Sequence, residues 1–128
     1  MILDTSAILA VLFREPGHER LIEKLLAAGR RGVGTPTLAE TGLVLAGRLE
    51  GDAEVLLSGF VRQFEILPVP FGDRHWRAAV EAFRRFGKGR HPAALNFGDC
   101  LSYATARLAD RPLLYVGDDF SRTDLEAA

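Results

Sequence analysis

Short apolar segments alternate along this chain with longer segments of helical periodicity, and this alternation is the feature that most limits its fold. Ile2-Leu3 runs directly into Asp4 and two hydroxyl residues, which indicates a buried strand followed at once by a helix. Further strands are expected at 32–36, 65–69 and 113–116, and helices at 6–13, 18–28, 36–48, 53–63, 73–86 and 97–109. Strands separated by helices pair in parallel through right-handed crossovers. The pattern predicts an α/β fold, a three-layer α/β/α domain with a small parallel sheet of four or five strands.

The size and composition of the chain fit one such domain. Its 128 residues are enough for a single hydrophobic core, so we expect one domain over residues 1–128. The formal net charge of −1 excludes a strongly basic nucleic-acid binder but not a local basic patch. Cys100 is the only cysteine, which excludes a disulfide framework and a cysteine-based zinc site. We find no targeting segment and no apolar run of membrane-spanning length, so we expect a soluble, cytoplasmic protein without a membrane partner.

Acidic residues recur at the places where strands end or helices begin. Asp4 follows the first strand, Glu40 and Asp99 lie just inside helix starts, and Asp118-Asp119 follows the last strand. In a parallel sheet these places lie along one edge, so the carboxylates should converge. Clustered carboxylates repel one another, which a protein tolerates when a cation neutralises them. All-oxygen ligation suits Mg²⁺ or Mn²⁺, and an ion held in this way supports phosphodiester hydrolysis.

Each acid also has a purely structural explanation. Glu40 lies three residues after Thr37, and Asp99 lies three residues after Asn96, which is the spacing of a capping box. An acid in the first turn of a helix also interacts favourably with the helix dipole. The acid after the first strand could be an N-cap, and the pair after the last strand could be an ordinary turn. Only the joint pattern along one sheet edge favours a metal site.

Four blocks of the sequence resemble the PIN-domain ribonucleases, specifically the VapC toxins of VapBC toxin–antitoxin systems. The blocks span the chain in order, and together they are specific. They are Ile2-Leu3-Asp4-Thr5-Ser6-Ala7, Thr35-Pro36-Thr37-Leu38-Ala39-Glu40, Leu95-Asn96-Phe97-Gly98-Asp99-Cys100, and Gly117-Asp118-Asp119-Phe120 with Thr123-Asp124 after it. The resemblance implies the α/β/α sandwich predicted above and Mg²⁺- or Mn²⁺-dependent endoribonuclease cleavage of RNA. It also implies a VapB-like antitoxin that suppresses the activity when bound.

The resemblance further implies roles for individual residues. Asp4 and Asp99 would be direct metal ligands, and Glu40 would orient or deprotonate the attacking water. Ser6 would support the site by hydrogen bonding to a ligand carboxylate or to a metal-bound water. The fourth acid is one of the neighbours Asp118 and Asp119, and Asp119 is favoured because it directly precedes the phenylalanine of its block.

A run of basic residues precedes the third acidic block. It consists of Arg84, Arg85, Lys88, Arg90 and His91. As RNA-binding residues, Arg85, Lys88, Arg90 and His91 would contact phosphates beside the metal site, which would reconcile RNA binding with the net charge. The alternative is a solvated helix end, where the helix dipole favours cations.

The pattern of apolar side chains predicts which residues form the core, and it also predicts apolar surface that the sheet does not cover. Trp76, Phe83 and Phe86 recur at helical spacing, and we expect all three in the core. The helices at 7–13 and 18–28 carry more apolar surface than one small sheet can cover. This excess predicts a groove for an antitoxin segment or a homodimer face, and we expect a homodimer.

Two other classes fit parts of the pattern. A haloacid-dehalogenase-like phosphatase also begins with a strand and an aspartate, but it requires a second acid two positions later, where this chain has Ser6. A non-catalytic PIN-like module that only binds RNA or protein would have no reason to keep several mutually repelling carboxylates. The sequence therefore favours a metal-dependent endoribonuclease that acts as the toxin of a toxin–antitoxin pair.

Overall fold

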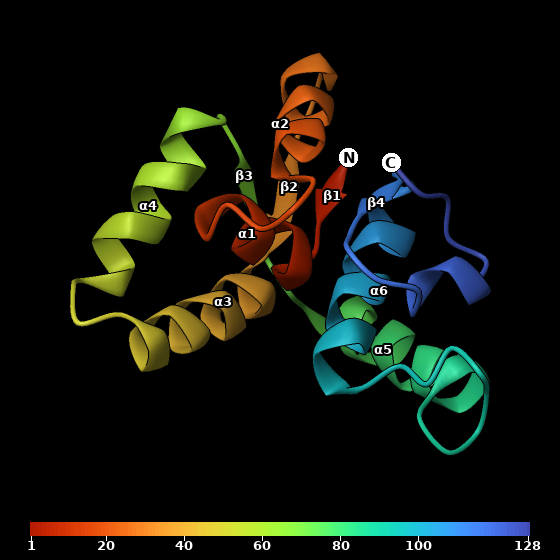
Figure 1. Ribbon diagram of the computed structural model, residues 1–128. Helices are drawn as coiled ribbons and strands as arrows, with labels where there is room; N and C mark the ends of the chain where they lie inside the picture. The colour runs from red at the N-terminus through yellow and green to blue at the C-terminus, as the bar shows by residue number, and fades with distance from the viewer.

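One parallel sheet of four short strands forms the centre of the molecule (Figure 1). The computed structural model describes all 128 residues. The strands are β1 (Ile2–Leu3), β2 (Gly32–Gly34), β3 (Leu67–Val69) and β4 (Leu113–Leu114), in the order β3-β2-β1-β4. All neighbouring pairs are parallel, as the alternation of strands and helices predicts.

Three strands are shorter than predicted. The segment 32–36 forms a strand only to Gly34, because α3 already begins at Thr35. The last two residues of the segment 113–116 lie beyond β4, because the ladder to β1 pairs only Leu113 and Leu114. The segment 65–69 forms a strand only from Leu67, and Pro68 lies inside β3 instead of ending it. A proline is tolerated there because β3 is an edge strand, where one side of the strand needs no hydrogen-bond donor.

Six helices surround the sheet at the expected places. They are α1 (Thr5–Leu12), α2 (His18–Ala27), α3 (Thr35–Arg48), α4 (Ala53–Gln63), α5 (Asp73–Phe86) and α6 (Phe97–Ala109), followed by the short 3₁₀ helix η1 (Phe120–Arg122). No helix combines the length and the apolar character needed to cross a bilayer.

The sheet separates two hydrophobic cores, which gives the predicted three layers. Ile2 and Leu113 point into a core shared with α5 and α6. The next residues, Leu3 and Leu114, point into a core built by α1 to α4. Successive side chains of a strand face opposite sides, so the two consecutive apolar residues of β1 and of β4 are enough to attach helices on both faces.

Helix α6 packs very closely against β2. A Cβ atom at Gly34 would lie 2.7 Å from the hydroxyl oxygen of Thr105 on α6, so only glycine allows this approach. The close packing holds α6 across the middle of the sheet. The first turn of α6 thereby comes beside the loop that follows β1.

The prediction that the aromatic face of α5 is core is wrong for two of its three members. Phe86 is buried, but Trp76 is 48% exposed and Phe83 is 40% exposed, and Val80 on the same face is 61% exposed. The core contacts of α5 come instead from its small residues, such as Ala82. Helical periodicity identifies an apolar face, but it does not show whether another element covers it.

The exposed apolar surface lies over α3, α5 and α6. A groove of about 690 Å³ runs there, lined by Pro36, Ala39, Glu40, Leu43, Val44, Phe71, Trp76, Phe97 and Leu101. The prediction had placed the excess apolar surface on the helices at 7–13 and 18–28. Most apolar side chains of those helices pack against the core, although Leu26 is 65% exposed.

Candidate active site

Asp4 is a buried carboxylate at the junction of β1 and α1. It is only 5% exposed, and it caps α1 by accepting the backbone N–H of Ser6 at 3.0 Å. The same oxygen, Oδ2, accepts the Ser6 hydroxyl at 2.6 Å, and Oδ1 accepts the Ser102 hydroxyl of α6 at 2.6 Å. Asp4 is therefore the N-cap that one structural explanation required. A cap needs only the first of these three bonds, and the other two fix the orientation of both oxygens.

Ser6 connects this carboxylate to the last strand. Its hydroxyl donates to Asp4 and accepts the backbone N–H of Val116, two residues beyond β4, at 3.0 Å. The side chain thus joins the loop after β1 to the segment that leads to Asp118 and Asp119.

Glu40 reaches the same region from α3. The helix begins at Thr35, with Gly34 as N-cap, so Glu40 lies in the second turn and the capping-box explanation is wrong for it. Its Oε1 accepts the Thr5 hydroxyl at 2.5 Å. Its other oxygen lies so close to Gly98 at the start of α6 that a Cβ atom there would be 2.1 Å away.

Asp99 does form the capping box that its spacing suggests. Its Oδ2 accepts the backbone N–H of Asn96 at 3.0 Å, and its own N–H donates to Oδ1 of Asn96 at 2.9 Å. The second carboxylate oxygen of Asp99 has no hydrogen bond within the protein. Capping therefore engages only half of this carboxylate.

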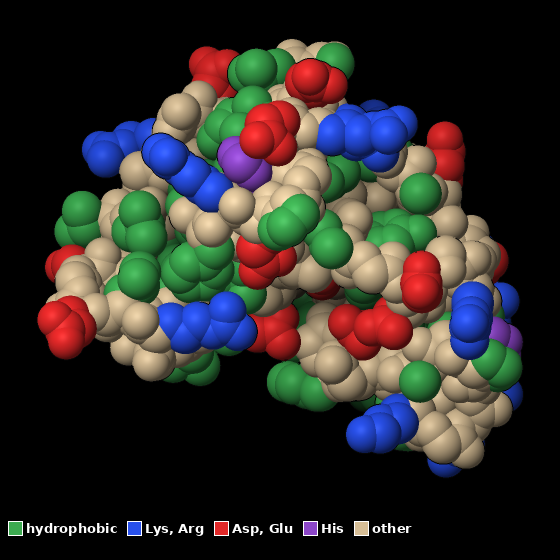
Figure 2. Space-filling model, in the orientation of Figure 1, with side chains coloured by type: hydrophobic (Ala, Val, Ile, Leu, Met, Phe, Trp, Pro, Cys, Tyr) green, Lys and Arg blue, Asp and Glu red, His purple; other side chains and the backbone are tan.

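The charge on Asp99 is disfavoured by its surroundings. Burial raises its pKa most, the hydrogen bond from Asn96 lowers it, and the charges of Asp4, Asp119 and Glu40 raise it further, to about 6. The charges that act on Asp99 come from three other segments of the chain. Figure 2 shows acidic side chains on both sides of a hollow between the surfaces of α3 and α6.

The adjacent acids after β4 differ in their relation to Asp99. Both are exposed, but only Asp119 acts on the pKa of Asp99. Asp118 uses its backbone carbonyl to accept the Ser121 hydroxyl and is part of the turn before η1. Asp119 is thus the neighbour whose charge reaches Asp99, and its role as the fourth acid stays a prediction.

The carboxylates surround a space instead of touching one another. No three acidic, histidine or cysteine side chains lie close enough to hold an ion as they stand. The donor set nevertheless suits a hard divalent cation that keeps several of its waters, because it offers only oxygen atoms and includes an oxygen of Asp99 without a partner. The raised pKa of Asp99 marks the same region as one where positive charge would be stabilised.

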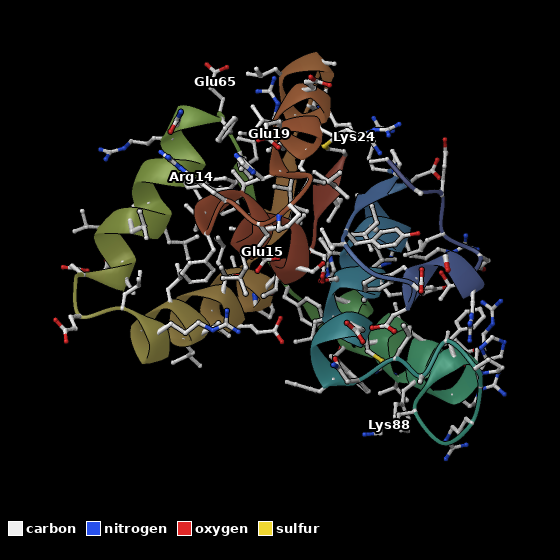
Figure 3. The ribbon with its side chains drawn as sticks, viewed as in Figure 1. Arg14, Glu15, Glu19, Lys24, Glu65 and Lys88 are labelled. Carbon is white, nitrogen blue, oxygen red and sulfur yellow. The ribbon has the colours of Figure 1, made fainter.

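The residues predicted to bind RNA divide into two kinds. Lys88 projects from the loop between α5 and α6, is exposed and forms no ion pair (Figure 3). Arg90 is also exposed, and its guanidinium lies 5.5 Å from the centre of the Phe83 ring. Both side chains are available to an external anion.

The other two predicted RNA-binding residues have internal partners. Arg85 pairs with Asp124 at 3.2 Å and lies over the ring of Phe86. The His91 ring packs edge-on against Phe86, and its Nδ1 accepts the backbone N–H of Ala93 at 3.0 Å. Neither side chain is as free as Lys88 or Arg90.

Three contributors to the site were not predicted from the sequence. Ser102 lies three residues after Asp99, on the same face of α6, and this spacing could have pointed to it. Thr5 donates to Glu40, and Gly98 leaves the space that the Glu40 carboxylate occupies. Neither pairing could be found by spacing, because each joins segments more than thirty residues apart.

Comparisons of the sequence identify the family. The PIN domain family model matches residues 1–126. Ribonuclease VapC36 of Mycobacterium tuberculosis is 44% identical over 127 residues, which cover 98% of this chain and 91% of that protein. Ribonuclease VapC of Mycolicibacterium smegmatis is 37% identical, with 99% of this chain and 98% of that protein covered.

Solved structures agree with the fold. VapC20 of Mycobacterium tuberculosis, described as a sarcin-ricin loop cleaving toxin, superposes with a TM-score of 0.79 over 99% of this chain and 97% of its own, at 18% identity. VapBC2 of Rickettsia felis, bound to a promoter DNA fragment, gives a TM-score of 0.78 over 99% and 96% of the two chains, at 14% identity. These likenesses confirm the three-layer fold. The family match and the 37–44% identity of its relatives show that this chain belongs to the PIN domain family as a VapC-type ribonuclease.

Proposed function

We propose that this protein is an endoribonuclease that hydrolyses RNA phosphodiester bonds with Mg²⁺ or Mn²⁺, and that it is the toxin of a type II toxin–antitoxin system. One observation carries the metal dependence. Carboxylates from β1–α1, α3, α6 and the turn after β4 face one region, and three of them raise the pKa of Asp99. A divalent cation is the partner that would relieve this repulsion.

Asp4 and Asp99 are the proposed direct ligands, with Asp119 as the fourth acid. The hydrogen bonds from Ser6 and Ser102 hold both oxygens of Asp4 in fixed directions, and the capping box holds one oxygen of Asp99 and leaves the other for the ion. When bound, the metal supplies positive charge that stabilises the negative charge developing on the phosphate.

Glu40 is the proposed base. Its hydrogen bond from Thr5 leaves the second carboxylate oxygen free of hydrogen bonds, beside the start of α6. That oxygen orients the attacking water and accepts its proton. Glu40 lies on α3, whereas the residues that would hold the ion lie on other elements, so Glu40 would serve as the base without being a ligand.

Lys88 and Arg90 are the proposed contacts to RNA phosphates. Both are exposed and lie in the loop between α5 and α6, the helix that carries Asp99. Arg85 and His91, which have internal partners, would contribute to the local positive potential and not to direct contacts. Neutralising Lys88 and Arg90 should flatten the salt dependence of RNA binding, and an unchanged slope would exclude them.

A VapB-like antitoxin and a second copy of this chain are the proposed partners. Relatives in solved structures support the antitoxin, since they include a toxin–antitoxin complex from Klebsiella pneumoniae and VapBC2 of Rickettsia felis. Size-exclusion chromatography with light scattering on the purified chain tests the homodimer directly. A monomer at micromolar concentration would contradict it.

The activity is tested with purified protein, free of antitoxin, on structured RNA with and without Mn²⁺. The wild-type protein should cleave only with the metal, and Asp4→Asn should lower the rate by about two orders of magnitude or more. Asp52→Asn is a matched control, because Asp52 also caps a helix through its side chain, at the start of α4, and is not one of the proposed site residues. If Asp4→Asn cleaves as fast as Asp52→Asn, the proposal is wrong.

A further inference from the structure

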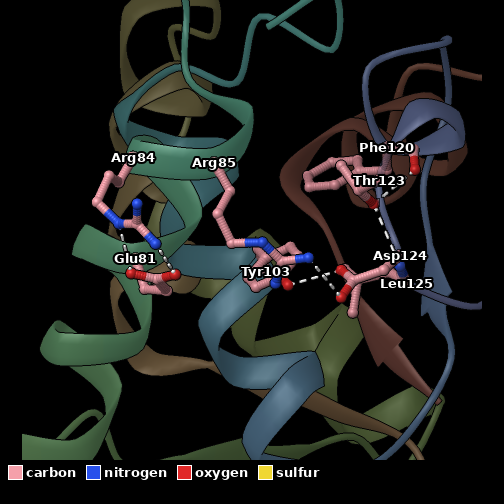
Figure 4. Close-up of polar contacts among 8 residues, drawn as sticks. All are labelled: Glu81, Arg84, Arg85, Tyr103, Phe120, Thr123, Asp124 and Leu125. Carbon is pink, nitrogen blue, oxygen red and sulfur yellow. Dashed lines mark hydrogen bonds and ion pairs between the residues drawn. The ribbon is translucent and has the colours of Figure 1, made fainter. Parts of the chain in front are cut away.

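A buried tyrosine, an aspartate and an arginine form a cluster beneath the C-terminal segment (Figure 4). The Tyr103 hydroxyl of α6 donates to Oδ1 of Asp124 at 2.7 Å, and the Arg85 guanidinium of α5 donates to Oδ2 at 3.2 Å. Neither Tyr103 nor Asp124 has a role predicted from the sequence, and the proposed mechanism uses neither residue. Two helices therefore hold one side chain of a segment that has no regular structure beyond η1.

The hydrogen-bonded residues Tyr103 and Asp124 each lie close in sequence to an acid of the proposed metal site. Tyr103 lies four residues after Asp99 on α6, one helical turn away on the same face. Asp124 lies five residues after Asp119, just beyond the single turn of η1. The hydrogen bond from Tyr103 to Asp124 thus joins the element that carries Asp99 to the segment that carries Asp119.

Asp119 has little support of its own. Its carboxylate is exposed and has no hydrogen bond in the protein. Its position therefore depends on the residues on either side of it, and Ser6 holds those that precede it through Val116. Phe120 is buried against Tyr115, with ring centres 5.2 Å apart, and the Thr123 hydroxyl donates to the Phe120 carbonyl at 2.8 Å.

A further attachment lies at the far end of the segment. The backbone N–H of Leu113 donates to the carbonyl of Glu126, and the N–H of Ala128 donates to the carbonyl of Leu113. Between Phe120 and these bonds, Asp124 is the residue whose side chain hydrogen-bonds to both α5 and α6. Leu125 also packs against the core, and Arg122 donates to the Pro92 carbonyl in the loop between the two helices. The cluster is therefore the polar attachment of the stretch on which the direction of Asp119 depends.

The cluster is electrostatically consistent. Burial alone would raise the pKa of Asp124, but the hydrogen bond from Tyr103 and the charge of Arg85 together lower it. Burial and the bond to Asp124 raise the pKa of Tyr103 to about 12. The donor stays protonated and the acceptor stays charged across the neutral range, so the contact is a charge-assisted hydrogen bond.

We propose that Tyr103, Arg85 and Asp124 are positioning residues, which set the place of Asp119 relative to Asp99 and thereby the affinity of the site for a divalent cation. This inference rests on the proposed function of the acids as a metal site. Partners that orient metal ligands affect affinity even though they do not touch the ion.

The test is a calorimetric Mn²⁺ titration of the full-length, metal-free protein and of two variants, Tyr103→Phe and Asp124→Asn. Tyr103→Phe keeps the buried ring and removes only the hydroxyl. Each variant should bind Mn²⁺ about tenfold more weakly than the wild type. In each, backbone amides of residues 117–124 should exchange hydrogen faster, while those of α3 and α4 should be unchanged.

Glu81→Gln is the matched control. Glu81 accepts from Arg84, also on α5, at 2.9 and 2.7 Å, and this exposed pair does not touch the C-terminal segment (Figure 4). The substitution removes one acid paired with an arginine of α5, as Asp124→Asn does, and it should leave Mn²⁺ affinity unchanged. Arg85→Lys, which keeps the positive charge, should bind Mn²⁺ more tightly than Arg85→Gln.

The possible results separate this inference from the proposed function. If Tyr103→Phe and Asp124→Asn melt at lower temperature but bind Mn²⁺ like the wild type, the cluster is only structural and the inference is overturned. If Glu81→Gln weakens binding as much as Asp124→Asn, the effect is one of net charge, and the inference is again overturned. A wild-type protein that binds no Mn²⁺ overturns the proposed function and this inference together.

Discussion

The carboxylate of Glu40 lies against the backbone of Gly98, with its Oε2 only 2.1 Å from where a Cβ atom of residue 98 would be. This contact joins α3 to the first turn of α6, next to Asp99. An added methyl group could be accommodated only by moving the end of the flexible Glu40 side chain. Gly98→Ala should therefore fold normally and cleave RNA roughly 100-fold more slowly, because the proposed base is displaced.

The measurement for Gly98→Ala is the single-turnover cleavage rate together with the free energy of unfolding. Gly59→Ala in α4 is the control, since nothing lies within 4 Å of a Cβ atom there. That control should gain about 0.5–1 kcal/mol of helix stability and keep full activity. Full activity in Gly98→Ala would show that the Glu40 position is not critical.

Ser102 offers a second test of the site. It is fully buried on α6, and its hydroxyl donates to Oδ1 of Asp4 at 2.6 Å. Ser102→Ala removes this bond and should lower both the cleavage rate and Mn²⁺ affinity by roughly 10- to 100-fold. Ser58→Ala, at an exposed position of α4, should change neither quantity.

The stability of the metal-free protein should depend on the ionisation of Asp99. The folded pKa is about 6, against an ordinary value of 3.8, so between these values the folded state holds a proton that the unfolded state has released. Stability should then fall as the pH rises from about 4 to above 6. Urea unfolding at several pH values should show this loss in the wild type and a smaller loss in Asp99→Asn.

Added Mg²⁺ should reverse this loss of stability, and more strongly at pH 7.5 than at pH 4.5, because the ionised carboxylate binds the cation. Asp73→Asn removes an exposed first-turn acid of α5 and serves as the control. It should follow the wild-type pH dependence. A pH profile of Asp99→Asn that coincides with that of the wild type would contradict the assignment.

Helical periodicity would place the apolar face of α5 in the core, but this face is exposed. Substitutions on it should therefore cost little stability. Val80 is 61% exposed, so Val80→Ser should change the free energy of unfolding by about 0.5 kcal/mol or less. Leu45 is fully buried, and Leu45→Ala should cost about 2–5 kcal/mol. Urea midpoints of both variants decide the matter, and a loss at Val80 close to that at Leu45 would place this face in the core.

The sequence was enough to predict the layers and the parallel sheet, and it indicated which acids follow strands or begin helices. That success has a simple cause: strands that end in acids bring them to one edge, whatever the details of packing. The sequence did not show where α3 begins. The helix starts at Thr35, so Glu40 lies in its second turn and not in the capping box that its spacing from Thr37 suggested. The sequence was also insufficient for Trp76, because periodicity does not reveal which apolar face another element covers.

The central claim is that Asp4 and Asp99 bind one ion together, and a double-mutant cycle on Mn²⁺ affinity tests it most directly. Calorimetric titrations would compare the wild type, Asp4→Asn, Asp99→Asn and the double variant. If the two carboxylates share an ion, each single change should remove most of the affinity, and the second change should add far less than its separate effect. If the two effects are independent and additive, or if either single variant binds Mn²⁺ like the wild type, the two carboxylates do not share a metal site.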